Sequence, residues 1–157
     1  MRKTPTLIGV SVLGALALGQ LNAAAPDPAA VQKVVDARVA KYKQIGKANK
    51  AIRDELAQSS PNLATVQANA GVIEALAKQI PSWFPRNSGQ QPGVKSEALP
   101  VIWQQVPTFK QRAVGLAGAA HQTAAAAASG NLAATQAAAS NIGAACKACH
   151  DTFREKK

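Results

Sequence analysis

Residues 107–154 read PTFKQRAVGLAGAAHQTAAAAASGNLAATQAAASNIGAACKACHDTFR, and this stretch decides the fold class. Apolar and small residues recur in it every three or four positions, first over 109–123 and again over 132–153. Such spacing places these residues on one face of a helix. The Ser-Gly-Asn sequence at 129–131 suits the end of one helix and the cap of the next. The stretch therefore predicts two helices joined by a tight turn.

Two further stripes of the same spacing precede this pair. The first runs from Pro28 to about Gln58, with Asp27 available to cap its start, and the second covers residues 63–80. Residues 81–95 hold three prolines and two glycines and form the one long irregular connection, after which a short helical turn is expected within 96–105. Two short connections and one long connection fit an all-α fold, an antiparallel four-helix bundle.

The composition allows one compact domain and excludes several classes of protein. With 157 residues, 47% of them hydrophobic, the chain is too apolar to be disordered, and its two cysteines are too few for a disulfide scaffold. Between residues 113 and 148, 17 of 36 residues are alanine. Alanine favours helix but fills little volume. A bundle lined by alanine either packs its backbones very closely or leaves room for another group.

Residues 1–25 have the layout of a secretory signal, with a basic start, an apolar centre and small residues before cleavage near Ala23 or Ala25. A transmembrane anchor is the alternative, but its apolar run of about 12 residues is shorter than the roughly 20 that span a bilayer. We therefore expect residues 26–157 to form a single exported domain. Cleavage would lower the net charge from +10 to near +8 and remove the sole methionine.

The chemically distinctive motif is CKACH at residues 146–150. It is the attachment signature of c-type haem, in which two thiols add across the porphyrin vinyl groups and the histidine binds the iron. A redox-active disulfide between Cys146 and Cys149 is one alternative, but such motifs normally follow a strand. A zinc site is another, and it would need His121 or a carboxylate as a fourth ligand. We therefore expect one thioether-linked haem c per chain, with His150 as the metal ligand.

The second axial position of the iron bears on function. Electron-carrying cytochromes usually fill it, often with methionine, but the cleaved chain has none, and His121 lies beside the inward stripe of its helix. We therefore predict a five-coordinate iron with one open face. Arg38 lies on the apolar face of the first helix, where it pairs with a haem propionate or reaches the bundle edge. Tyr42, one turn later, either packs in the core or projects toward the iron.

The sequence resembles the cytochrome c′ family, periplasmic bacterial haem proteins with a four-helix bundle, over nearly all of residues 28–157. The segments that carry the resemblance are CKACHDTFR at 146–154, PVIW at 100–103, Phe109-Lys110, Trp83-Phe84-Pro85 with Gly89, and Arg38 with Tyr42 four residues later. The chain departs from the family at the position after Arg38, where Val39 stands in place of the glutamine that implies a polar contact to the haem in many members.

The resemblance implies a high-spin haem held by Cys146, Cys149 and His150, with Arg38 on a propionate and Tyr42 over the open face. Arg154 corresponds to the basic residue near the proximal face, and a solvated terminal charge is the alternative interpretation. The resemblance also implies homodimers through the first two helices. The alanines on the expected outer faces of these helices are Ala48, Ala51, Ala64, Ala68 and Ala75.

The implied function is the binding of nitric oxide and carbon monoxide in the periplasm, in a role of nitric oxide binding or detoxification. An electron carrier that docks an acidic redox partner is the alternative, and a dithiol redox protein is a distant third. A peroxidase would need a distal acid–base residue, and His121 is poorly placed for that role. We therefore expect no enzymatic activity, no nucleic-acid partner and, after cleavage of the leader, no membrane association.

Overall fold

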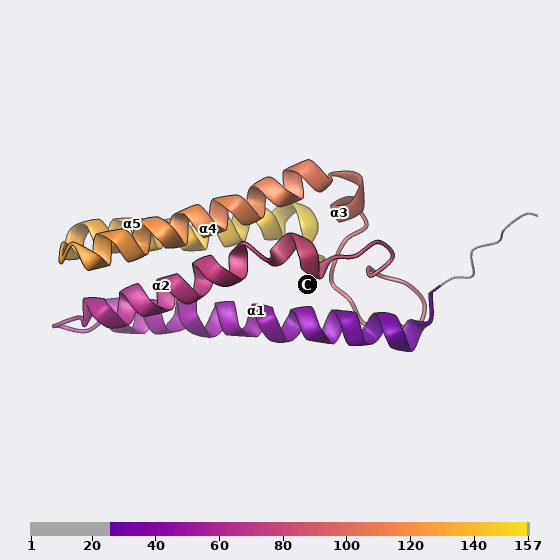
Figure 1. The fold of residues 1–157 in the computed structure, drawn as a ribbon, viewed down its shortest axis with the longest axis horizontal. Helices are drawn as coiled ribbons and strands as arrows, with labels where there is room; N and C mark the ends of the chain where they lie inside the picture. Colours follow the sequence, from indigo (N-terminus) through magenta and orange to yellow (C-terminus); the bar gives the residue numbers. More distant parts are fainter. Residues whose placement is uncertain (1–25, 157) are drawn as a thin grey trace, which may run out of the picture.

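The computed structural model describes residues 26–156, so the predicted leader at residues 1–25 and Lys157 lie outside the described residues. Four long helices run antiparallel along one axis (Figure 1). They are α1 (Pro28–Leu56), α2 (Leu63–Ala77), α4 (Val106–Ala128) and α5 (Leu132–Phe153), with the 3-10 turn η1 (Ile80–Trp83) and the short helix α3 (Val101–Gln104) in the long connection. The predicted all-α four-helix bundle is confirmed. No helix within residues 26–156 is long and apolar enough to cross a membrane.

The helix boundaries follow from local chemistry. The side chains of Asp27, Asn62 and Asn131 each accept a backbone N–H of the following first turn at 3.0 Å. Gly130 adopts a left-handed φ of 74° and closes the turn between α4 and α5. The second helix ends three residues earlier than predicted, because the chain tightens into η1 around Pro81.

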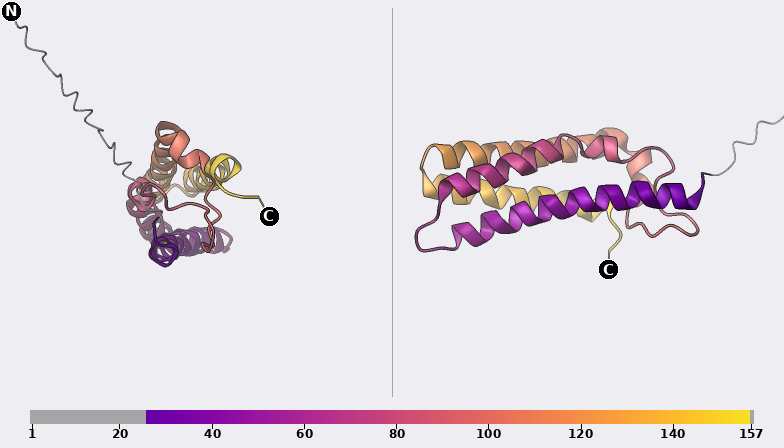
Figure 2. Two further views of the ribbon diagram at one scale, coloured as in Figure 1. Left: turned by 90° about the vertical axis from the view of Figure 1, so that its right-hand side faces the viewer. Right: turned by 60° about the horizontal axis from the view of Figure 1, so that its bottom comes forward.

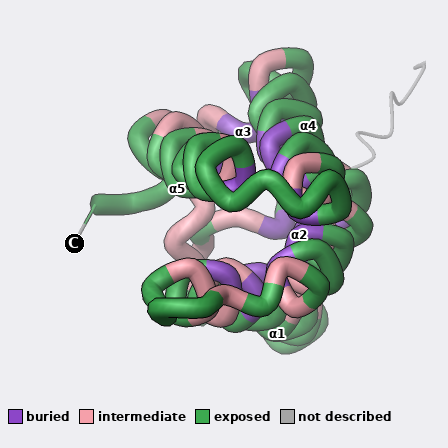
Figure 3. The backbone as a smooth tube through the Cα atoms, turned by 90° about the vertical axis from the view of Figure 1, so that its left-hand side faces the viewer, coloured by how far each residue is buried: buried purple, intermediate pink, exposed green. Residues whose placement is uncertain are grey.

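The four long helices do not pack evenly around the axis. α1 packs on α2, α2 on α4 and α4 on α5, whereas α1 and α5 meet at only a few residues. Figure 2 shows α1 and α5 on adjacent sides of the bundle, and Figure 3 shows buried residues concentrated between the other helix pairs. Both interpretations of the alanine-rich stretch, close helix packing and room for another group, are therefore partly correct. Small residues bring α2, α4 and α5 close together, while the fourth side is held by few direct contacts.

One expected surface residue belongs to the core instead. Ala48 is only 4% exposed and packs in the hydrophobic core with Ile45 and Ile52 of the same helix, so its predicted place on the outer face of α1 is wrong. An alanine side chain is too small to mark the buried face of a helix by hydrophobicity, and its neighbours decide the orientation. Ala64 and Ala68 of α2 are exposed, as predicted.

The part of the long connection between η1 and α3, residues 84–100, is bound to the end of α5. The backbone N–H of Leu99 donates to the carbonyl of Phe153 at 3.1 Å, and the N–H of Glu155 donates to the carbonyl of Glu97 at 2.8 Å. These bonds form a short β-like contact immediately after the CKACH motif. The connection therefore carries its own side chains to the end of the bundle that holds the two cysteines.

Candidate functional site

The two cysteines lie on a half-buried face of α5. This face is on the side of the bundle where α5 and α1 make few contacts. Cys146 and Cys149 are both free thiols and both pack against the hydrophobic core. Burial raises the pKa of each, that of Cys149 to about 11, where the neighbouring Cys146 adds to the effect and Arg112 opposes it. The nucleophilic cysteine of a dithiol oxidoreductase has a lowered pKa. The environment therefore disfavours the dithiol alternative.

His150 lies in the last turn of α5, on its exposed side. Partial burial of the ring and the positive charge of Arg154 lower the pKa of the imidazole, against the opposing charges of Asp151 and Glu97. A neutral imidazole is the form that binds a metal ion. Among the described residues, no three histidine, cysteine or acidic side chains gather as a group that could hold a metal ion.

Arg38 is a buried cation held by neutral groups. It is 4% exposed, so it does not reach out at the bundle edge. Its Nη1 donates to Ser88 Oγ at 3.0 Å and its Nη2 to Ser96 Oγ at 2.9 Å, while the guanidinium stacks 4.4 Å above the centre of the Phe84 ring. Burial lowers the pKa of Arg38. Two hydroxyls orient the guanidinium without balancing its charge, and a carboxylate would do so.

Tyr42 connects the α1 side of the site with the cysteines. Its ring meets Trp83 edge-on at a centroid distance of 5.3 Å and Phe84 at 6.3 Å. Burial raises the pKa of its hydroxyl, the negative charges of Cys149 and Cys146 would raise it further, and Arg38 lowers it. The phenol is therefore neutral. Tyr42 and both cysteines pack against the same hydrophobic core, and Tyr42 and Arg38 both contact Phe84.

Sequence reasoning missed several residues of this neighbourhood. Ser88 and Ser96 bind Arg38 from positions 50 and 58 residues away, and small polar residues in a loop carry no signal of such a role. The sequence identifies Trp83 only as part of a loop that resembles the family. It is buried against Tyr42, and the ammonium of Lys41 lies 5.0 Å from the centre of its ring.

Other candidate residues lie elsewhere or have other partners. His121 is exposed on α4, with Nδ1 3.3 Å from a carboxylate oxygen of Glu74 on α2. Val39 is exposed on α1. Arg154 is not a free terminal charge, and its positive charge lowers the pKa of the nearby His150. It forms an ion pair with Glu97 at 2.7 Å.

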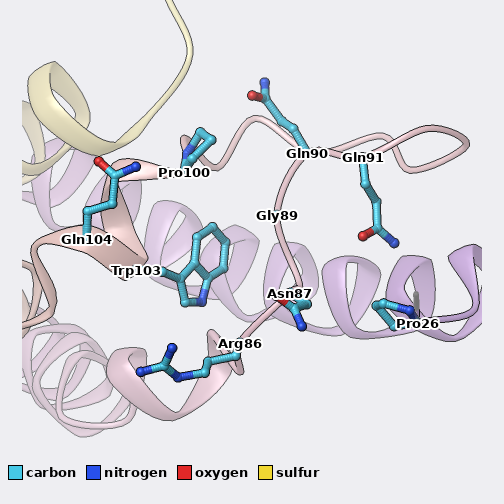
Figure 4. Close-up of a pocket in the computed structure, with 9 residues that line it drawn as sticks. All are labelled: Pro26, Arg86, Asn87, Gly89, Gln90, Gln91, Pro100, Trp103 and Gln104. Atoms are coloured by element: carbon cyan, nitrogen blue, oxygen red, sulfur yellow. The ribbon is translucent and has the colours of Figure 1, made fainter. Parts of the chain in front are cut away.

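One cavity is separate from this cluster. It measures about 490 Å³ and lies between the long connection and α3 (Figure 4). Its lining residues are Pro26, Arg86, Asn87, Gly89, Gln90, Gln91, Pro100, Trp103 and Gln104. The indole of Trp103 forms one wall, and its Nε1 donates to the carbonyl oxygens of Pro85 at 3.0 Å and Phe84 at 3.3 Å. None of the predicted cofactor residues line this cavity.

Comparison with known proteins gives a consistent result. The sequence family described as Cytochrome C′ matches residues 33–154. Cytochrome c-554 of Cereibacter sphaeroides is 42% identical over 88 residues, which cover 55% of this chain and 57% of that protein. Cytochrome c′ of Pararhodospirillum photometricum is 34% identical over 128 residues, which cover 81% of this chain and all of the relative.

Solved structures agree with the sequence relatives. Cytochrome c′ from Thermochromatium tepidum superposes with a TM-score of 0.73 at 30% identity, covering 85% of this chain and 100% of the other. A cytochrome c′ with ligand-controlled dimer dissociation gives a TM-score of 0.72 at 30% identity, with 80% and 97% covered. A ferrous variant of cytochrome c′ from Alcaligenes xylosoxidans with bound NO gives 0.70 at 26% identity, with 81% and 97% covered.

Proposed function

Because the chain belongs to the cytochrome c′ family, we propose that it is a periplasmic haem protein that binds nitric oxide and carbon monoxide without acting as an enzyme. Haem c, covalently bound, is the cofactor of this family and of this chain. When bound, the haem would supply an iron that can take up a small gas molecule. The observation that carries the proposal is the packing of Cys146, Cys149 and Tyr42 on one hydrophobic core, with Phe84 in contact with both Tyr42 and Arg38.

The chain's donor groups fit haem c. We assign the thiols of Cys146 and Cys149 to the two thioether bonds, each formed when the S–H adds across a vinyl group. We assign the neutral imidazole of His150, in the residue that follows, to the iron. Three observations support the fit: the thiols are half-buried among apolar residues, they are not joined to each other, and α1 and α5 make few direct contacts beside them.

Arg38 fits one propionate of the haem. The guanidinium is already buried and oriented by Ser88 and Ser96, so it needs little reorganisation to pair with a carboxylate. Its two present partners are neutral, and an anionic partner would balance the buried charge. The role of Arg38 in this proposal is therefore to hold and orient the cofactor from α1.

Tyr42 limits access to the open side of the iron. The edges of Trp83 and Phe84 hold its ring, and α1 directs it toward the neighbourhood of the two cysteines. In this proposal the side chain of Tyr42 acts by its bulk over the open side of the site. In this proposal the bulk of the ring slows the entry of any ligand.

The test combines spectra of the holoprotein with two variants of Tyr42. We expect high-spin absorption and EPR spectra and ready uptake of nitric oxide by the ferrous protein. Tyr42→Ala should speed carbon monoxide association about tenfold, equivalent to a barrier lower by about 1.4 kcal/mol, whereas Tyr42→Phe keeps the ring and the wild-type rate. Low-spin spectra with both axial positions filled would contradict the proposal and favour an electron carrier.

We also propose that the protein forms homodimers through α1 and α2. Ala64, Ala68 and Ala75 are exposed on α2, and Val72 on the same helix is 45% exposed. Small side chains beside an exposed valine allow a second copy to approach closely. The cytochrome c′ whose dimer dissociates under ligand control supports a dimer in this family.

A further inference from the structure

Trp83 carries a buried hydrogen-bond donor without an acceptor. Its side chain is 5% exposed, and its Nε1 is the one buried side-chain nitrogen or oxygen without a hydrogen-bond partner among the described residues. An indole N–H can only donate, and burying it unpaired is unfavourable. Trp103, by contrast, donates to two backbone carbonyls. The fold therefore satisfies one of the two indoles from its own backbone and leaves the other to a different acceptor.

The surroundings of Trp83 select an acceptor with negative charge. The ammonium of Lys41 lies 5.0 Å from the centre of its ring, and the ring meets Tyr42 edge-on at 5.3 Å. The next residue, Phe84, lies under the guanidinium of Arg38. Cations therefore lie against the rings of two consecutive residues, Trp83 and Phe84. Such an arrangement favours a carboxylate over a neutral oxygen.

We propose that the indole N–H of Trp83 donates a hydrogen bond to a propionate of the haem, in addition to the contact made by Arg38. This inference rests on the proposed haem site. The rim of a haem is apolar apart from its two propionates, so these are the groups that a buried donor can reach. Arg38 comes from α1 and Trp83 from η1. Donors on two separate elements fix the orientation of the ring, which a single donor beside flexible thioether links does not.

The chain's tryptophan content allows a direct test, because it holds only two tryptophans. Holoprotein labelled with ¹⁵N-tryptophan, reduced and saturated with carbon monoxide, should give two indole N–H signals, assigned with Trp83→Phe and Trp103→Phe. We expect the Trp83 signal to be shifted downfield, to exchange slowly with solvent, and to show nuclear Overhauser contacts to propionate methylene protons. In Trp83→Phe we expect the propionate bending bands of the resonance Raman spectrum to shift and the reduction potential to fall.

Several results would overturn the proposal. A Trp83 signal with contacts to water and none to the propionates would show that a buried water is the acceptor. Unchanged propionate bands and potential in a folded Trp83→Phe protein would have the same meaning. The central measurement uses the wild-type protein, so it stands even if the variant fails to fold. Uptake of carbon monoxide, read from the absorption of the same sample, separates failure of the proposed function from failure of this contact.

Discussion

Gly89 lies against Trp103 so closely that a single methyl group should destabilise the long connection. A Cβ at this position would lie 2.7 Å from Cζ3 and 2.8 Å from Cη2 of the indole. The indole is a rigid ring, and its Nε1 is tied to the carbonyls of Pro85 and Phe84. It therefore has little freedom to move aside. In Gly89→Ala either the loop backbone or the indole must shift.

The expected loss of stability in Gly89→Ala has two sources, overpacking and a lost hydrogen bond. Overpacking of a rigid contact costs about 1–3 kcal/mol, and loss of the hydrogen bond from the Trp103 N–H adds about 1 kcal/mol. We therefore expect Gly89→Ala to lower the free energy of unfolding by about 2–4 kcal/mol. Ser88 lies next to Gly89 and binds Arg38, so the same shift should loosen the Arg38 contact.

Denaturant unfolding of the holoprotein, followed by circular dichroism and haem absorption, measures this cost. Gly46→Ala is the matched control, because a Cβ at Gly46 meets no atom within 4 Å. Gly46 lies inside α1, where alanine should stabilise the helix by about 0.5–1 kcal/mol. The two glycine variants should therefore change stability in opposite directions.

A double-mutant cycle decides whether the clash is the cause. In a Trp103→Phe background the two clashing ring atoms are absent, so Gly89→Ala should cost less than about 1 kcal/mol. If Gly89→Ala costs as much there as in the wild type, or costs nothing in the wild type, the argument from this close contact is wrong.

Three further predictions concern the site, the dimer and the pH dependence. Arg38→Met should lower the reduction potential of the haem, because a nearby cation disfavours the ferric state and its removal ends that effect. Arg53→Met, on the exposed part of α1, should leave the potential unchanged, and redox titration measures both variants. Val72→Glu should give monomers in sedimentation velocity, whereas Val114→Glu, at a 69% exposed site on α4, should leave the dimer intact. Hydrogen bonds from a lysine and a histidine lower the pKa of Glu74 from 4.5. The contribution of the Glu74 carboxylate to the free energy of unfolding is therefore present above pH 4.5 and lost as the pH falls through the lowered pKa. The difference in stability between wild type and Glu74→Gln should therefore vanish in acid.

Much of the fold follows from short-range patterns. Helix stripes, capping side chains and the turn at Gly130 depend on residues within a few positions of one another, so the helices of the bundle could be predicted from the sequence. The CKACH motif is equally local, because its chemistry needs only five consecutive residues. The apolar face of α1 likewise predicted that Arg38 and Tyr42 would lie on the same side.

The sequence was therefore enough to predict the four long helices and the chemical motif. Packing between helices sets which side of the bundle has few contacts, which serines bind Arg38, and, among the described residues, the burial of the Trp83 indole N–H without an acceptor. It also decided that Ala48 faces the core. These features depend on packing between residues far apart in the chain, and small side chains such as alanine and serine carry too weak a local preference to predict such contacts.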